Sequence, residues 1–254
     1  MSSDGCVDFT IDGQPVSAAA GETVLTAARR HGIRIPTLCH HEALPDDGRC
    51  RLCVVEVAKG GRTRLVTACL YPAEAGIAVS TSSPDVDLVR RTVLELLWAR
   101  CPNAPEIASL AREYGVREQR YKARAGDERC ILCGLCIRAC TKTLNVSAIS
   151  FGGRGIEKKA STPFDDASPG CVGCGSCASV CPTRCIPQRD TAQTRLIWGK
   201  TFQFVPCKTC GAPVMTVEHR AHALAQAGLP EDYYDVCEPC KQAAAAGRFA
   251  SVVW

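Results

Sequence analysis

The sequence lacks any apolar run long enough to cross a bilayer, since a transmembrane helix needs about 20 consecutive apolar residues. Its polar start, MSSDGCVDF, also lacks the basic and apolar segments of a secretory signal. We therefore expect a cytoplasmic protein with no direct membrane insertion.

Concentrated positive charge is missing as well. Thirty basic residues against 26 acidic ones give a formal net charge of +4, and the two signs are mixed along the chain. Binding of nucleic acid usually requires a concentrated basic face. We therefore predict no nucleic acid among the partners.

The common motifs of nucleotide-binding and hydrolytic enzymes are also absent. No GxGxxG follows a strand-like run and opens a helix-like one, and the cluster Gly152, Gly153 and Gly155 lacks that context. There is no GxSxG, HExxH or GxxxxGK. We expect no catalytic residues in this chain, so catalysis would lie in a partner subunit.

Cysteine is what the chain has in abundance, with 19 among 254 residues. A disulfide scaffold is typical of short secreted chains, whereas here most cysteines occur in groups of four built around CxxC, which in a reducing compartment bind metal. Four such groups leave Cys6, Cys101 and Cys185, which we expect to be unliganded. Cys185 stands where a small apolar residue would serve, so we expect it to pack like one.

Two of the groups repeat the pattern CxxCxxCxxxC, over residues 130–140 and again over residues 171–181 with Pro182 directly after. This is the pattern of bacterial two-cluster ferredoxins, in which the fourth cysteine of each motif ligates the other cluster. Two zinc sites are the less specific alternative. We assign one [4Fe-4S] cluster to Cys130, Cys133, Cys136 and Cys181, and the other to Cys171, Cys174, Cys177 and Cys140.

A third group has the spacing Cx10CxxCx15C and consists of Cys39, Cys50, Cys53 and Cys69. Plant-type [2Fe-2S] ferredoxins also carry a CxxC within a long loop and a distant fourth ligand, although the first gap is longer here. The sequence therefore predicts a [2Fe-2S] site, with zinc as the alternative. A Rieske centre needs a different pairing of histidine with cysteine, so we expect His40 and His41 to be solvated loop residues.

The fourth group consists of the knuckles CKTC and CEPC, which supply Cys207, Cys210, Cys237 and Cys240. Two CxxC pairs at this separation are typical of a structural zinc site, and iron in a rubredoxin-like site is the alternative. Four thiolates complete a tetrahedral shell, so we expect His219 and His222 to be surface residues. We also expect that deleting residues 200–254 would leave all three clusters intact.

Periodicity predicts an α+β fold. Residues 7–81 alternate like a small sheet around one helix, residues 84–116 carry helical spacing broken by two prolines, and RLIWGKTFQFV is strand-like. The expected order is a β-grasp [2Fe-2S] domain, a helical linker, a bacterial two-[4Fe-4S] ferredoxin domain and a zinc-ribbon-like tail. We place them at residues 5–82, 83–125, 126–192 and 200–250.

The order of these motifs carries a family resemblance. LCHHEALPDDGRCRLCVVEV is followed by RLVTACL, by the helical LELLWARCP and then by the paired ferredoxin motifs. Over roughly residues 5–190 the chain resembles the iron-sulfur subunits of the NADH dehydrogenase G-subunit type. Similar modules occur in the small diaphorase subunit of NAD-linked NiFe hydrogenases, in FeFe hydrogenases and in NAD-dependent formate dehydrogenases.

The resemblance implies a non-catalytic electron-transfer subunit of an oxidoreductase complex. Its partners in a hetero-oligomer would be a flavoprotein that oxidises NAD(P)H and a catalytic subunit of the hydrogenase or formate-dehydrogenase type. The alternatives are a freestanding ferredoxin-like carrier and, from a third class, a zinc-binding interaction protein.

One departure from the family is clear. The family continues its helical segment into HxxxCxxCxxxxxC, which holds a further [4Fe-4S] cluster through one histidine and three cysteines. Here the matching stretch LWARCPNAPEIASLAREYGV contains Cys101 alone. We therefore expect that cluster to be absent.

Overall fold

The computed structural model describes residues 5–250, which form two compact units. The first unit comprises the chain up to Arg138 together with Val180–Cys185, and the second comprises Ala139–Ser179 and the chain from Ile186 onward. Each unit therefore contains a short piece of the cysteine motif that mostly belongs to the other. None of the helices in the described range is long and apolar enough to span a membrane.

The first unit contains a five-stranded sheet in the order β2-β1-β5-β3-β4. β1 (Cys6–Ile11) and β2 (Gln14–Ala19) form a hairpin whose turn residues Asp12 and Gly13 both have positive φ, as hairpin turns require. The other strands are β3 (Val54–Lys59), β4 (Arg62–Thr67) and β5 (Ala78–Ser80), the last parallel to β1.

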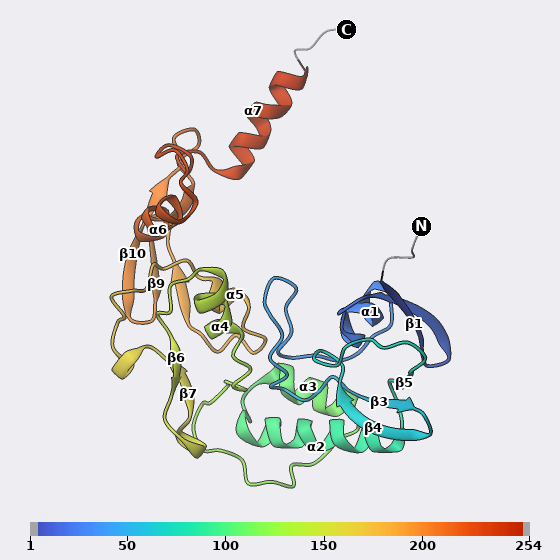
Figure 1. Cartoon of the computed structure of the whole chain (residues 1–254). Coiled ribbons are helices and arrows are strands. Elements are labelled where there is room, and N and C mark those ends of the chain that lie inside the picture. The colour runs from blue at the N-terminus through green and yellow to red at the C-terminus, as the bar shows by residue number, and fades with distance from the viewer. Residues whose placement is uncertain (1–4, 251–254) are drawn as a thin grey trace. The chain divides into compact units, whose positions relative to one another are not determined.

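Helix α1 (Val24–Arg30) packs its apolar side against this sheet (Figure 1). It begins after Thr23, whose hydroxyl accepts a hydrogen bond from the Thr26 amide at 3.3 Å, as N-cap residues do. Leu25 of the helix and Ile11 and Val55 of the sheet are fully buried in one core. The predicted combination of a small sheet and one helix is confirmed.

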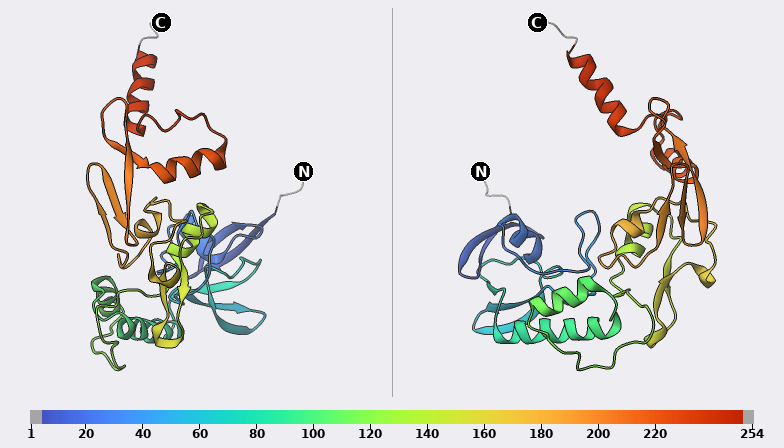
Figure 2. Two further views of the ribbon diagram at one scale, coloured as in Figure 1. Left: turned by 90° about the vertical axis from the view of Figure 1, so that its left-hand side faces the viewer. Right: turned by 180° about the vertical axis from the view of Figure 1, so that it is seen from behind.

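Two helices follow the sheet, as the apolar spacing predicted: α2 (Pro84–Arg100) and α3 (Pro105–Glu113). Proline stands at the first turn of each, where its missing N–H costs no hydrogen bond. The helices lie side by side in both directions of view (Figure 2). Arg90 of α2 is buried and donates to the carbonyl of Val54 at 2.7 Å, which ties α2 to the strand that follows the CxxC of the third cysteine group.

The segment that contains the two ferredoxin motifs has little regular structure, as expected where metal rather than apolar burial organises a chain. Its elements are short: α4 (Leu135–Arg138), η1 (Ala139–Thr143), β6 (Ser150–Gly152), η2 (Gly155–Glu157), β7 (Lys159–Ser161), η3 (Pro163–Asp165) and α5 (Ser176–Ser179).

The second unit contains an antiparallel sheet in the order β11-β10-β9-β8. Its strands are β8 (Gln188–Asp190), β9 (Thr194–Ile197), β10 (Lys200–Pro206) and β11 (Pro213–Thr216), followed by α6 (Val217–Ala227) and α7 (Glu238–Ala250).

The stretch RLIWGKTFQFV, which we predicted as one strand, is a hairpin of β9 and β10. Its turn consists of Trp198 and Gly199, with φ values of 53° and 72°. Two-residue turns of this kind are usually recognised by Asn or Asp before Gly, and a tryptophan in the first position conceals the signal.

Candidate cluster and metal sites

The third cysteine group lies in the first unit and is almost fully buried. Cys39 and Cys50 come from the loop between α1 and β3, Cys53 directly precedes β3, and Cys69 follows β4. The Sγ atoms of Cys53 and Cys69 are 3.4 Å apart, and the amide of Cys50 donates to Cys39 Sγ at 3.3 Å. The charge of Cys39 also acts on both Cys53 and Cys69, and the charge of Cys53 acts on Cys50. The structure therefore brings the predicted [2Fe-2S] residues together.

The loop that carries this group is held in a tight conformation. Gly48 has φ +62°, and a Cβ there would lie 2.5 Å from Leu70 Cδ1, the residue after Cys69. His40 is not the solvated residue that we expected: its side chain is only 10% exposed, and its Nδ1 lies 2.6 Å from Asp46 Oδ1. This pair fixes the loop next to Cys39.

The first predicted [4Fe-4S] set lies entirely within the first unit and consists of Cys130, Cys133, Cys136 and Cys181. The charges of Cys130 and Cys181 act on the thiol of Cys133, although Cys181 is far away in sequence. Burial raises the pKa of Cys133 to about 12, so this thiol needs nearby positive charge, such as iron, to lose its proton.

Cys185 also lies in this site, although its sequence position predicted only an apolar packing residue. Its Sγ is 3.5 Å from Cys181 Sγ, its amide donates to the same sulfur at 3.4 Å, and its side chain also hydrogen-bonds with Cys130. The turn after Cys181 thus directs position 185 at the sulfur atoms, so Cys185 is more than an apolar packing residue. That it is unliganded stays a prediction.

Two side chains at the C-terminal end of α2 donate hydrogen bonds to the first ferredoxin motif. Arg100 Nε donates to the carbonyl of Cys130 at 3.0 Å, and Cys101 Sγ donates to the same oxygen at 3.1 Å. Cys101 is fully buried, and burial raises its pKa to about 12, so it stays a neutral thiol that donates a hydrogen bond.

The cysteines predicted to hold the second [4Fe-4S] cluster lie within the second unit, around one mostly enclosed apolar pocket. Four cysteines line it, together with Ile197 and Trp198 from the β9–β10 hairpin: Cys140, Cys171, Cys174 and Cys177. Cys140 belongs to the first motif but sits with the second, where the amide of Ala148 donates to its Sγ at 3.2 Å. Burial raises the pKa of Cys177 to about 11, although the indole of Trp198 opposes this by donating to the sulfur.

The backbone of the second motif allows no side chain at one position. Gly173 has φ +68°, and a Cβ there would lie 2.5 Å from the ring of Phe202, which is fully buried. Phe202 of β10 therefore fills the space that any other residue at position 173 would need.

Polar side chains of the second sheet donate hydrogen bonds to the backbone of residues 171–174. Arg195 donates to the carbonyls of Gly173 at 3.0 Å and Cys174 at 2.7 Å. Lys200 donates to the carbonyl of Cys171 at 3.3 Å, and Thr216 donates to that of Val172 at 2.5 Å. Residues from position 200 onward thus contact the loop of the second cysteine motif, which argues against the expectation that deleting residues 200–254 would leave all three clusters intact.

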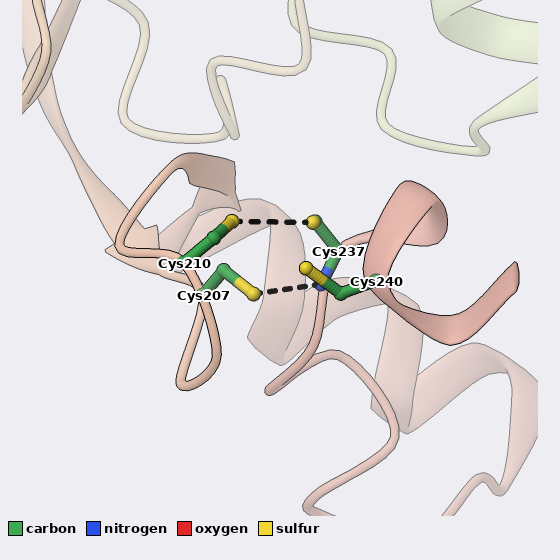
Figure 3. A group of neighbouring side chains, drawn as sticks. All are labelled: Cys207, Cys210, Cys237 and Cys240. Carbon is green, nitrogen blue, oxygen red and sulfur yellow. Dashed lines mark hydrogen bonds between the residues drawn. The ribbon is translucent and has the colours of Figure 1, made fainter. Parts of the chain in front are cut away.

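The fourth cysteine group faces one common point (Figure 3). Cys207 and Cys210 follow β10, whereas Cys237 and Cys240 lie at the start of α7, and all four Sγ atoms lie within 4.8 Å of one another. Tetrahedral zinc with bonds of about 2.3 Å separates its sulfur ligands by about 3.8 Å. The space therefore fits one ion rather than a cubane of four irons.

Two backbone amides donate hydrogen bonds to a cysteine sulfur of this site. The amides of Cys237 and Thr209 donate to Cys207 Sγ at 3.3 and 3.4 Å. The Cys237 amide is the main reason that the pKa of Cys207 falls to about 6. The two expected surface histidines are partly buried instead, and His222 Nε2 lies 2.7 Å from the carbonyl oxygen of Leu144.

Two segments of the chain match known iron-sulfur domains. Residues 5–84 match the family model of a 2Fe-2S iron-sulfur cluster binding domain, and residues 123–187 match that of a 4Fe-4S dicluster domain. A solved structure, the NAD+-reducing [NiFe]-hydrogenase in the H2-reduced state, contains a chain 34% identical to this one. The TM-score is 0.53, and the match covers 61% of this chain and 74% of that chain.

Two curated proteins are also similar in sequence to this chain. The G-subunit 2 of NADH-quinone oxidoreductase from Rhizobium meliloti (strain 1021) is 31% identical over 233 residues, which is 81% of this chain and 27% of that protein. The HndD subunit of the NADP-reducing hydrogenase from Solidesulfovibrio fructosivorans is 33% identical over 212 residues, which is 72% of this chain and 36% of that protein. The matches define one family, the iron-sulfur subunits of NADH dehydrogenases and NAD(P)-linked hydrogenases.

The chain belongs to this family. It spans only about a quarter to a third of the length of these curated relatives. Its two matched segments make it an iron-sulfur protein of the 2Fe-2S and 4Fe-4S type. The strands β8–β11 and helices α6 and α7 lie beyond residue 187 and thus outside both family models.

Proposed function

We propose that this chain is a non-catalytic electron-transfer subunit of a cytoplasmic oxidoreductase complex. It relays electrons between a flavoprotein that oxidises NAD(P)H and a catalytic subunit of the hydrogenase or formate-dehydrogenase type. Support comes from the names of the relatives, which include NADH-quinone oxidoreductase and NADP-reducing hydrogenase subunits. Iron-sulfur clusters supply one-electron storage and transfer.

The observation that carries the proposal is the exchange of cysteines between the two motifs. The first unit contains Cys130, Cys133 and Cys136 with Cys181, and the second contains the later motif with Cys140. This exchange is the ligand pattern of two-cluster ferredoxins, and zinc sites have no need of it. We therefore assign these eight cysteines to two [4Fe-4S] clusters.

The third group serves a [2Fe-2S] cluster in a β-grasp type of domain. Its four cysteines are between 1% and 7% exposed, so the chain shields this site from solvent on most sides. A buried environment of this kind disfavours four free thiolates unless iron balances their charge.

No fourth iron-sulfur cluster is part of the proposal. The family's histidine motif is replaced by a stretch with Cys101 alone, and this thiol donates to a backbone carbonyl rather than facing a ligand set. Electrons therefore pass between the three proposed clusters, or to a cluster of a partner.

The four-cysteine site near the end of the chain holds zinc in our proposal. The sulfur atoms are spaced for one tetrahedral ion, and two backbone amides already donate to Cys207. Zinc has no redox chemistry, so the site stabilises the local fold. Iron in the same shell is the alternative, and metal analysis of the purified chain distinguishes them.

The experiment that tests the function is anaerobic affinity purification of the tagged chain from its own cell, with mass spectrometry of the chains that accompany it. We expect a flavoprotein together with a hydrogenase- or dehydrogenase-type large subunit. A brown monomer that reduces several unrelated enzymes would instead favour the freestanding carrier. A colourless protein would refute both, and would leave the zinc-binding interaction protein.

A further inference from the structure

The hairpin of β9 and β10 reaches the second cluster site through its turn. Trp198 occupies the first turn position, and its indole N–H donates to Cys177 Sγ with an Nε1–Sγ distance of 3.3 Å. The indole also lines the pocket that the four cysteines of this site share. A side chain from outside both matched family domains therefore touches a ligand atom directly.

The backbone of Trp198 indicates that this placement is not incidental. Its φ of 53° lies in the left-handed region, which bulky side chains rarely adopt. Such strain persists where the surrounding structure fixes it, and it is concentrated at functional sites. Here the neighbours that fix it are Gly199, which completes the turn, and Ile197, which is 1% exposed in the same pocket.

Two cations of the same hairpin point at the same loop. Arg195 is bound to Asp190 at 2.7 Å and donates to two carbonyls of the loop, and Lys200 donates to the carbonyl of Cys171. Lys200 also lies 4.6 Å from the centre of the Phe202 ring and 4.0 Å from Glu218, so its position is held from both sides. The hairpin thus presents one sulfur hydrogen bond and two cations, each paired with a carboxylate, to one cluster site.

Reduction adds one negative charge to a cluster and its thiolates. A hydrogen bond to a ligand sulfur, or a nearby cation, stabilises the more negative state more strongly and so raises the reduction potential. We propose that the β9–β10 hairpin raises the reduction potential of the second [4Fe-4S] cluster, with Trp198 as the donor to the thiolate of Cys177. This rests on the proposed function, because it requires that cluster to be present.

The test is the substitution Trp198→Phe in the full chain, purified without oxygen. Phenylalanine keeps an aromatic ring over the pocket but removes the N–H. The variant therefore removes the hydrogen bond while the ring still excludes water from the site. We expect the midpoint potential of one [4Fe-4S] signal, followed by electron paramagnetic resonance (EPR) during a redox titration, to shift to a more negative value. At a fixed solution potential, the ratio of reduced to oxidised cluster should fall about five- to tenfold relative to the parent protein.

The matched control is Trp98→Phe, the same change on α2 of the first unit. It should leave the titration of every cluster unchanged. Lys200→Met should shift the same signal in the same direction as Trp198→Phe, because it removes a cation without touching a ligand sulfur. An intact cluster whose potential is the same in Trp198→Phe and in the parent protein would overturn the inference.

A second measurement covers the case in which Trp198→Phe fails to retain its cluster. Tryptophan labelled with 15N at the indole gives a weak magnetic coupling between that nitrogen and the reduced cluster if the hydrogen bond exists. We expect this coupling in the parent protein and in Trp98→Phe. Its absence from a parent protein with two reduced [4Fe-4S] clusters would refute the inference alone, whereas a protein without these clusters would refute the proposed function as well.

Discussion

The guanidinium of Arg138 donates a hydrogen bond of 2.6 Å to the main-chain carbonyl of Cys39, and a second bond of 3.3 Å to that of Cys133. Both acceptors are residues of proposed cluster sites, one of the [2Fe-2S] group and one of the first [4Fe-4S] group. Arg138 also donates to the carbonyl of Pro45 and is only 8% exposed. One buried cation thus joins the loops of two sites within the first unit.

The first prediction concerns Arg138→Met. Methionine retains much of the side-chain volume but leaves the buried carbonyls of Cys39 and Cys133, and that of Pro45, without their charged donor. This should lower the free energy of unfolding by about 2–4 kcal/mol. The two loops should also separate, so the magnetic interaction between their reduced clusters should weaken. Chemical denaturation and the microwave-power saturation of the [2Fe-2S] EPR signal measure the two effects.

Arg51→Met is the control for this change, because Arg51 lies in the same cysteine loop and is exposed. It should change neither quantity beyond about 0.5 kcal/mol. Unaltered relaxation of the [2Fe-2S] signal in Arg138→Met, with both clusters present, would show that Arg138 does not set the distance between the sites.

The second prediction concerns Phe202, whose ring fills the space beside Gly173. Phe202→Ala should cost about 3–5 kcal/mol and open the second cluster site to solvent. Iron analysis and absorbance spectra should show loss of the second [4Fe-4S] cluster during aerobic handling, with the first two sites retained. Gln203→Ala, an exposed position on the same strand, should behave like the parent protein.

A truncated chain extends the same prediction. Deleting residues 200–254 removes Lys200, Phe202 and Thr216, which all contact the loop of the second cluster motif. We expect the truncated chain to lose that cluster and to keep the other two. Retention of all three would show that the second sheet is separable from the cluster sites after all.

The third prediction concerns two cysteines outside the proposed ligand sets. Cys6 is exposed, whereas Cys101 is fully buried with a pKa raised to about 12 by burial. With the clusters intact at pH 8, iodoacetamide should alkylate Cys6 and leave Cys101 unmodified, as peptide mass spectrometry would show. Rapid modification of Cys101 in the folded protein would contradict its burial.

The same shift in the pKa of Cys101 predicts a dependence of stability on pH. The ordinary pKa of the thiol is 9.0, so the unfolded chain loses this proton first and the folded chain binds more protons between pH 9 and about 12. The contribution of the neutral Cys101 thiol to stability is therefore intact below pH 9 and is lost as the pH rises from 9 to about 12. Cys101→Ala should make the fall in unfolding free energy over pH 9–10.5 less steep by up to about 1.4 kcal/mol per pH unit.

Most of the grouping of the cysteines could be predicted from the sequence, because ligand spacing is local. The repeated CxxCxxCxxxC motif indicated the grouping of Cys140 with the later motif, and the two CxxC knuckles indicated the fourth site. The helix pair was equally visible, since apolar spacing and prolines mark α2 and α3.

What the sequence did not reveal are contacts between residues far apart in the chain. Arg138 meets an acceptor 99 positions away, and nothing in its own motif distinguishes it from a solvated arginine. Trp198 reaches Cys177 only because positions 198 and 199 form a turn that local propensity argues against. Cys185 likewise looked like a small core residue until the turn after Cys181 placed it against the sulfur atoms.

The fourth prediction concerns the metal near the end of the chain. Cys210→Ser should remove one zinc per chain, since a hydroxyl is a poor zinc ligand, and should leave the iron content unchanged. Plasma emission analysis of protein purified in metal-free buffer measures both. Loss of iron rather than zinc would establish a rubredoxin-like site.

The proposed electron relay is tested most directly by low-temperature EPR of the anaerobically purified protein before and after addition of NAD(P)H, with and without the flavoprotein that accompanies it. We predict reduced [2Fe-2S] and [4Fe-4S] signals with NAD(P)H only when the flavoprotein is present, and the same signals with dithionite alone. Reduction of the isolated chain by NAD(P)H without a flavoprotein, or no iron-sulfur signal even with dithionite, would contradict it.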